Sequence, residues 1–180
     1  MKNKRPNGSA PLVTLPEMCV FAMLGALMFA SKKLMEALPN VHLVGLLLAV
    51  ITVAFRMKAL IPLYLYVFLD GLFGGFSLWW LPYLYVWTPL WGAIMLCPRH
   101  VGRTVKIVLC AILCGLHGLL FGVLYAPMQA LLFGLDFKQT LAWIAAGFPF
   151  DLIHGISNLV LGTLIVPLAE LLEKLKKKHL

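Results

Sequence analysis

Hydrophobic residues along this chain gather in long runs, and six of the runs approach the length that a helix needs to cross a bilayer. They cover residues 15–31, 41–55, 59–76, 81–97, 105–133 and 149–171. None of them alternates apolar and polar residues, as the strands of a membrane barrel would. We therefore predict an all-α, polytopic membrane protein in which six transmembrane helices form one bundle, a single domain over residues 1–180.

The composition supports a membrane environment. Of the 180 residues, 62% are hydrophobic and 12% are charged, and a soluble domain of this size cannot hide so much apolar surface. The first run lacks a small-residue cleavage site and leads into further runs, so we expect a retained helix and not a signal peptide. Short basic tails are expected at residues 1–14 and 172–180. The fifth run contains Pro127, which predicts a kink in that helix.

The basic residues predict the orientation of the bundle. With six spans and a cytoplasmic N-terminus, 12 of the 15 Lys and Arg residues fall on the inner side. The three on the outer side are Lys32, Lys33 and Lys138. This excess predicts that both termini are cytoplasmic. The net charge of +8 then follows from topology and from contact with anionic lipid headgroups, so we expect no nucleic-acid partner.

Polar residues interrupt the last run in the stretch "FPFDLIHGISNLVLG". In a helix, Asp151, His154 and Asn158 share one face. We expect Pro149 to begin this helix, where proline is tolerated, with Asp151 in the first turn. The predicted topology places these polar side chains, several others and an aromatic group in the outer half of the bundle.

This convergence of acids, imidazoles, an amide and flat rings predicts a small-molecule pocket. The candidate substrate-binding residues are Asp70, Trp79, Trp80, Tyr83, Trp87, His117, Asp151, His154 and Asn158. Each also has a structural interpretation. The aromatic residues can form an interfacial belt, Asp151 can cap a helix, and His117 and Asn158 can join neighbouring helices.

Small residues form a stripe on the first run. Ala22, Ala26 and Ala30 are spaced by four residues, with Gly25 beside them. Such a stripe lets another helix approach closely. It predicts either packing inside the bundle or a docking face for a separate membrane protein.

Taken together, the chain resembles the substrate-binding S component of an energy-coupling factor (ECF) vitamin transporter. The resemblance rests on about 180 residues, six helices, two inner termini, the alanine stripe, and the His154–Asn158 spacing followed by Gly162. It implies a bacterial or archaeal cell-membrane protein that binds substrate near the outer face and docks on a transmembrane T component. Ala22 and Ala26, extended by Ala30, match the docking motif of that family.

The resemblance also implies that the T component is coupled to two cytoplasmic ATPases. The chain itself lacks a glycine-rich phosphate loop, so its energy must come from these partners. We expect a transport subunit and not an enzyme, with no cofactor. The rings and acids favour a nitrogen heterocycle, for which thiamin, its pyrimidine precursor, B6 vitamers and deazapurine bases are suitable. Lys32 and Lys33 argue against this ligand class: they either meet a carboxylate or phosphate, or mark the lipid interface.

Two other classes remain open. A metal permease is suggested by Cys110, Cys114 and His117, which share one helix face and would suit a soft metal. A small membrane enzyme is suggested by Asp70, Asp151 and the histidines, which offer acid–base groups. The four cysteines lie within or beside predicted spans, so none predicts an extracellular disulfide.

Overall fold

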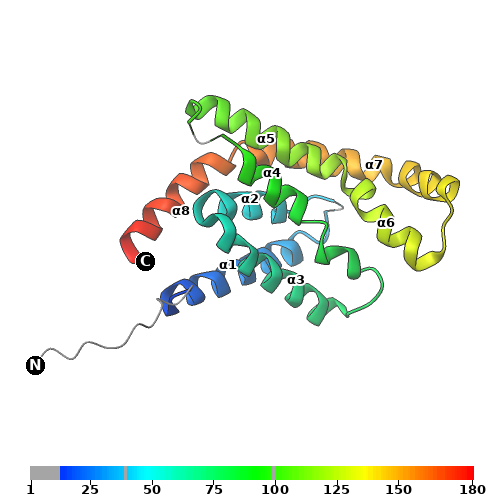
Figure 1. Cartoon of the computed structure of the whole chain (residues 1–180), viewed down its shortest axis with the longest axis horizontal. Coiled ribbons are helices and arrows are strands. Elements are labelled where there is room, and N and C mark those ends of the chain that lie inside the picture. Colours follow the sequence, from blue (N-terminus) through cyan, green and yellow to red (C-terminus); the bar gives the residue numbers. More distant parts are fainter. Residues whose placement is uncertain (1–12, 39, 99) are drawn as a thin grey trace, which may run out of the picture.

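The computed structural model describes residues 13–38, 40–98 and 100–180, and in these residues it contains helices and no strand (Figure 1). The prediction of an all-α fold is confirmed. The helices are α1 (Leu15–Leu34), α2 (Val44–Phe55), α3 (Leu60–Gly74), α4 (Thr88–Leu96), α5 (Arg103–Leu119), α6 (Phe121–Phe133), α7 (Phe137–Gly162) and α8 (Ile165–His179). Two short 3-10 helices, η1 (Arg56–Ala59) and η2 (Leu81–Leu84), precede α3 and α4.

All six predicted runs are helical, but the described residues contain four stretches that are long and apolar enough to cross a membrane. These are Leu15–Leu34, Val44–Gly74, Arg103–Phe133 and Phe137–Gly162. The stretch Val44–Gly74 joins the second and third predicted runs. The fourth run forms only η2 and the nine-residue α4, which rises about 14 Å and is shorter than the about 30 Å hydrocarbon core. The helices are compatible with a multi-pass membrane protein.

Two helix boundaries differ from the prediction. Pro149 lies inside α7 and does not begin that helix. The helix begins at Phe137 because Asp136 and Gln139 form a capping box, in which Asp136 accepts from the Gln139 amide at 2.8 Å. In the fifth run, the helix breaks at Leu120, between α5 and α6, and not at Pro127. At the C-terminus, the expected tail continues α8 as far as His179.

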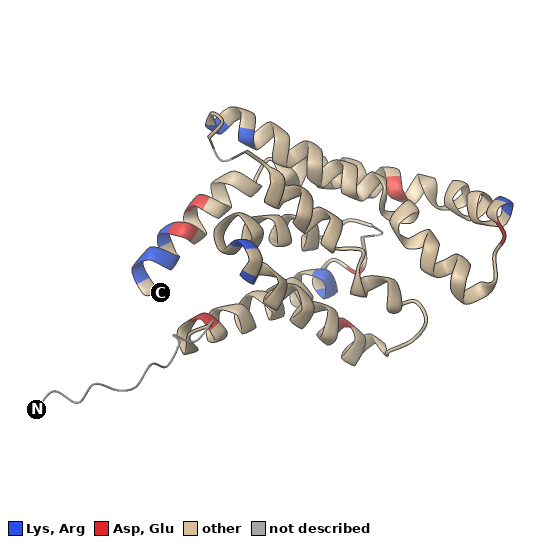
Figure 2. Cartoon of the chain, in the orientation of Figure 1, with Lys and Arg blue, Asp and Glu red and all other residues tan. Residues whose placement is uncertain are grey.

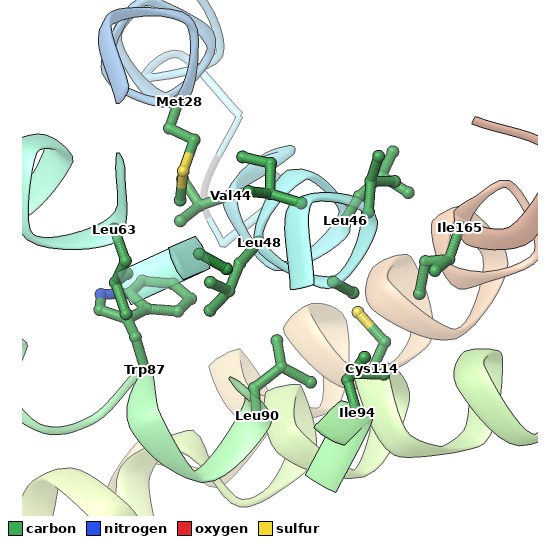
Figure 3. Packing of buried hydrophobic residues seen from close by; sticks show 14 of the residues in the cluster. Met28, Val44, Leu46, Leu48, Leu63, Trp87, Leu90, Ile94, Cys114 and Ile165 are labelled. Atoms are coloured by element: carbon green, nitrogen blue, oxygen red, sulfur yellow. The ribbon is translucent and has the colours of Figure 1, made fainter. Parts of the chain in front are cut away.

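Helix α2 lies at the centre of the bundle. Ten of its 12 residues are buried, which explains a run that is apolar all round. Figure 3 shows Met28, Leu63, Trp87 and other side chains from the surrounding helices converging on it. The helix ends at Arg56, whose φ of 56° lies in the left-handed region, and the chain then turns into α3.

Helices α1 and α3 run parallel to each other. Contacts follow the same order along both, from Glu17–Lys58 through Gly25–Leu65 to Lys32–Asp70. A Cβ on Gly25 would lie 2.9 Å from Leu65 Cδ2, so glycine permits this approach.

Helices α5 and α7 pack closely along one side of the bundle, in opposite directions (Figure 1). A Cβ on Gly118 would lie 2.8 Å from the His154 carbonyl oxygen, and one on Gly162 would lie 2.6 Å from Ala111 Cα. Because Gly118 and Gly162 carry no side chain, these helices approach closely. Their short distance sets the relative position of His117 and His154.

Charged side chains gather at one end of the bundle, which we call the charged end (Figure 2). Its residues are Glu17, Arg56, Lys58, Arg103, Lys106, Glu170, Glu173 and Lys176. Ion pairs join Lys58 to Glu17 at 2.6 Å and Arg103 to Glu170 at 3.0 Å. The start of α1 and the end of α8 both lie on this side (Figure 1). The basic segment 1–12 and Arg99, which contributed to the predicted orientation, lie outside the described residues.

Candidate functional site

A cavity of about 190 Å³ lies at the opposite end of the bundle. The connection between α1 and α2 supplies most of its wall, and single side chains come from α1, η2, α6 and α7. The lining residues are Lys32, Met35, Glu36, Leu38, Asn40, Val41, His42, Tyr83, Phe121 and His154.

Six rings are in contact beside and beneath this cavity, and we call them the ring cluster: His42, Tyr83, Trp87, His117, Phe121 and His154. The His42 and His154 rings are 4.7 Å apart between centroids, and the His154 and Phe121 rings are 5.0 Å apart. Trp87 lies 5.5 Å from His117 and 6.0 Å from Tyr83. Most of these pairs meet edge to face, a favourable arrangement for aromatic rings.

The buried side-chain nitrogen and oxygen atoms that lack a hydrogen-bond partner in the described residues all lie in or next to the ring cluster. They are His42 Nδ1, Tyr66 Oη, Trp87 Nε1, His117 Nδ1, His154 Nε2, and Asn158 Nδ2 and Oδ1. Each such atom costs about 1–3 kcal/mol. Folded proteins contain few of them, so this concentration marks a place where a hydrogen-bonding molecule can bind.

Asn158 and Tyr66 extend this polar region below the cavity. Asn158 is fully buried on α7, one turn beyond His154. Its amide nitrogen lies 2.9 Å from the Cβ position of Gly118 on α5, and 3.3 Å from that of Gly45 on α2. Tyr66 on α3 has its ring 6.0 Å from that of Trp87. The region therefore reaches the middle of the bundle.

The hydrogen bond of His117 defines its tautomer. Its Nε2 lies 2.8 Å from the Val86 carbonyl oxygen. A carbonyl oxygen only accepts, so Nε2 carries the proton and Nδ1 is an acceptor. Beside it, the indole Nε1 of Trp87 can only donate. The ring cluster thus presents both a donor and an acceptor on adjacent rings.

Lys32 is the cation on the cavity wall, and its ammonium group is fully engaged. It donates to both carboxylate oxygens of Asp70, at 2.7 and 2.8 Å. It also lies 4.7 Å from the centre of the Tyr83 ring and 5.6 Å from that of Trp79. Asp70 is 2% exposed and lies behind Lys32, away from the cavity lining.

His42 precedes α2 and is neutral at physiological pH. Burial, followed by the positive charge of Lys32 and the proximity of His117, lowers the pKa of His42 to about 4. Its ring therefore offers one donor and one acceptor nitrogen.

The structure brings five of the nine predicted site residues together. Tyr83, Trp87, His117 and His154 belong to the ring cluster, with Asn158 beneath them. Trp79 is 40% exposed and lies at the edge of this region, against Tyr83 and the Lys32 ammonium.

The other predicted residues have structural partners. Trp80 donates its indole N–H to the Val67 carbonyl at 2.8 Å. Asp151 accepts the Gly122 amide at 3.0 Å. It is therefore neither a cap nor a first-turn acid of its own helix, and instead caps the start of α6.

Four residues of this region were not among the predicted site residues: Lys32, His42, Tyr66 and Phe121. In the sequence, His42 lies just after a Pro-Asn pair and just before the apolar run of α2, which is a usable signal for a wall residue. Tyr66 and Phe121 carry no such signal, because their position depends on how α3 and α6 pack.

Two larger cavities lack this chemistry. An apolar groove of about 310 Å³ lies between α5 and α7 and is lined by Leu and Ile side chains together with Gly115 and Gly155. A polar cavity of about 420 Å³ lies at the charged end, where Lys176 donates to the Ala54 carbonyl. Neither contains a buried polar atom without a partner within the described part of the chain.

The cysteines suggested for a metal permease and the acids suggested for a membrane enzyme have other surroundings. Cys110 and Cys114 are buried in the core, and His117 directs Nε2 toward Val86. The described residues contain no group of three or more His, Cys, Asp or Glu side chains able to hold a metal. Asp70 and Asp151 are engaged with Lys32 and Gly122, respectively.

The alanine stripe lies on the surface of α1. Ala22, Ala26 and Ala30 are exposed, whereas Phe21 and Gly25 are buried on the face toward the bundle. The stripe is therefore not used for packing among the described helices.

Comparison with protein-family models, curated proteins and solved structures found no match to this chain.

Proposed function

We propose that this chain is the substrate-binding subunit of a membrane uptake system for a small nitrogen-containing ring compound. The observation that carries the proposal is the group of buried, unpartnered polar atoms in and next to the ring cluster, which lies beside a cavity. Such atoms are costly in an empty protein and are satisfied when a hydrogen-bonding molecule binds. Flat rings would stack on the aromatic side chains.

The distribution of charge supports an outward-facing site. Lys and Arg dominate the charged end, which the positive-inside rule assigns to the cytoplasm. The cavity lies at the other end, and would then face the outside of a bacterial or archaeal cell. The start of α1 and the end of α8 lie at the charged end (Figure 1), which accords with two cytoplasmic termini, although α4 alone is too short to cross a bilayer.

The exposed alanine stripe on α1 supports a partner in the membrane. We propose that Ala22, Ala26 and Ala30 contact a transmembrane T component, which is coupled to two ATPases that supply the energy. Small residues allow close helix contact in lipid, where apolar burial alone gives no preference for a protein neighbour.

The binding proposal is tested with the purified chain in detergent. Small molecules that it releases on denaturation are identified by mass spectrometry, and their affinity is measured by calorimetry. Replacing Asn158 or His154 by Leu removes hydrogen bonds of about 1–3 kcal/mol, so affinity should fall about ten- to a hundredfold.

The same variants give an independent readout of stability. In the ligand-free chain, Asn158→Leu should raise the melting temperature, because a buried amide without partners is replaced by an apolar side chain. Thr163→Ala is the control: its exposed hydroxyl donates to the Val160 carbonyl at the end of α7 at 2.7 Å, away from the cavity, so affinity should be retained. Folded Asn158→Leu and His154→Leu variants with full affinity would leave the polar stripe as a helix contact and refute this site.

A further inference from the structure

The charges around the cavity are already paired. Lys32 contacts both oxygens of Asp70 and the faces of two rings. Glu36, on the rim, accepts from Lys33 at 3.1 Å. A charged ligand would therefore have to compete with the existing Lys32–Asp70 pair, whose carboxylate is buried. Bringing a charge into such a place without a counter-charge is costly.

The atoms without partners are uncharged. On the cavity wall, His42 Nδ1 and His154 Nε2 lack partners. Behind the wall, Trp87 Nε1 is a donor, His117 Nδ1 is an acceptor, and the Asn158 amide offers both. An inorganic anion could satisfy only the donors, and an ammonium ion only the acceptors. A molecule that satisfies this region must itself carry donors and acceptors.

The size of the cavity limits the ligand further. Its volume is about 190 Å³, and a protein cavity of about 150 Å³ holds one benzene ring. The space therefore suits one ring or a small fused pair. Its walls of Phe121, Tyr83 and two imidazoles favour a flat molecule.

We propose that the ligand is an uncharged, planar heterocycle with both donors and acceptors, and that Asp70 determines this preference by neutralising Lys32. This inference rests on the proposed function, since it concerns the same site. Asp70 is a specificity-determining residue that acts through Lys32 and does not contact the ligand. Without its carboxylate, the Lys32 ammonium would face the cavity as an unpaired cation and would favour an anion.

The test compares probes that differ in charge, by quenching of Trp87 fluorescence in the purified full chain. Nicotinamide and hypoxanthine are the uncharged probes with one and two rings. Nicotinate is the anionic counterpart of nicotinamide, and 1-methylnicotinamide is the cationic one. The wild-type chain should bind at least one uncharged probe at least tenfold more tightly than either charged probe. A Trp87→Phe variant should lose this quenching, which would assign the fluorescence change to Trp87.

Asp70→Asn tests the role of the carboxylate. The ratio of nicotinate to nicotinamide affinity should rise at least tenfold. The control, Glu170→Gln, removes a carboxylate from the exposed pair with Arg103 at the charged end, so the same ratio should change less than threefold because water and salt screen that charge. If Asp70→Asn does not fold, Lys32→Met combined with Asp70→Asn removes both charges and should retain the preference for uncharged probes.

The outcomes separate this inference from the proposed function. Tighter binding of nicotinate or 1-methylnicotinamide by the wild-type chain would overturn the inference and leave the binding function intact. An unchanged affinity ratio in folded Asp70→Asn, or loss of the preference in the double variant, would also overturn it. Failure of all four probes at millimolar concentration would refute both.

Discussion

The two ends of the bundle differ in whether their polar groups have partners. At the charged end, polar groups have partners: Glu17 with Lys58, Arg103 with Glu170, and Lys176 with the Ala54 carbonyl near the end of α2. At the ring cluster, most polar atoms are uncharged, deeply buried and without partners. The charged end even has the larger cavity, about 420 Å³ against about 190 Å³. Volume alone therefore does not identify a binding site, whereas unsatisfied hydrogen bonding does.

The largest effect is expected where α5 meets the polar region. Gly118→Ala would place a methyl group 2.8 Å from the His154 carbonyl and 2.9 Å from the Asn158 amide. Overpacking of this kind costs about 1–3 kcal/mol, and it would also displace His154 and Asn158, on which the proposed site depends. We expect a lower melting temperature and loss of ligand binding, measured by thermal melts and calorimetry.

Gly92→Ala is the control for that variant. Gly92 lies in α4, and a Cβ there would meet no atom within 4 Å. Alanine favours helix by about 1 kcal/mol over glycine, so stability should rise or stay constant, with binding intact. If both variants bind ligand equally well, the close contact at Gly118 does not shape the site.

A smaller effect should appear as the pH is lowered. His42 has a pKa of about 4 in the folded chain, against an ordinary value of 6.5, because burial, Lys32 and the neighbouring His117 disfavour its charge. The His154 ring also faces His42, at 4.7 Å between centroids. The unfolded chain gains a proton first as pH falls, so stability is complete above pH 6.5 and is lost progressively toward pH 4. The loss is on the order of 3 kcal/mol at most.

The measurement is the free energy of unfolding against pH for the wild type and for His42→Phe. The variant should have a shallower dependence between pH 6.5 and 4, by about one proton. Parallel curves would show that His42 takes up its proton as readily in the folded chain as in the unfolded chain, and the ring cluster would then tolerate a charge.

The smallest effect belongs to the charged end. Arg103 and Glu170 pair at 3.0 Å, with exposed fractions of 60% and 44% for their side chains. The pairing lowers the pKa of Glu170, but exposed pairs add little to stability. Glu170→Gln should leave both melting temperature and ligand affinity unchanged within error. A clear loss of affinity in this variant would mean that the two ends are coupled.

The helical character of this fold was predictable because apolar runs depend only on local composition. The helix start at Phe137 was also encoded locally, in the capping box of Asp136 and Gln139, yet Pro149 was the more conspicuous signal and led to a wrong boundary. The reduction of the fourth run to the short α4 follows from Pro82 and Pro89, which interrupt regular helix on either side of Trp87.

The candidate site was predictable only in part. Trp87, His117 and His154 could be grouped because their predicted depths agree. The partner of Asp70 could not be predicted, because it depends on α1 and α3 running parallel after the turn at Arg56. Phe121 entered the cluster through the helix break at Leu120, and its place there depends on how α6 packs.

That break between α5 and α6 has a kinetic consequence. The first amides of a helix lack backbone partners, so they would ordinarily exchange their protons with water quickly. The Gly122 amide instead donates to the Asp151 carboxylate at 3.0 Å, across to α7. Its exchange with deuterium can proceed only when α6 separates from α7, and the rate at this single amide therefore reports how often the two helices part.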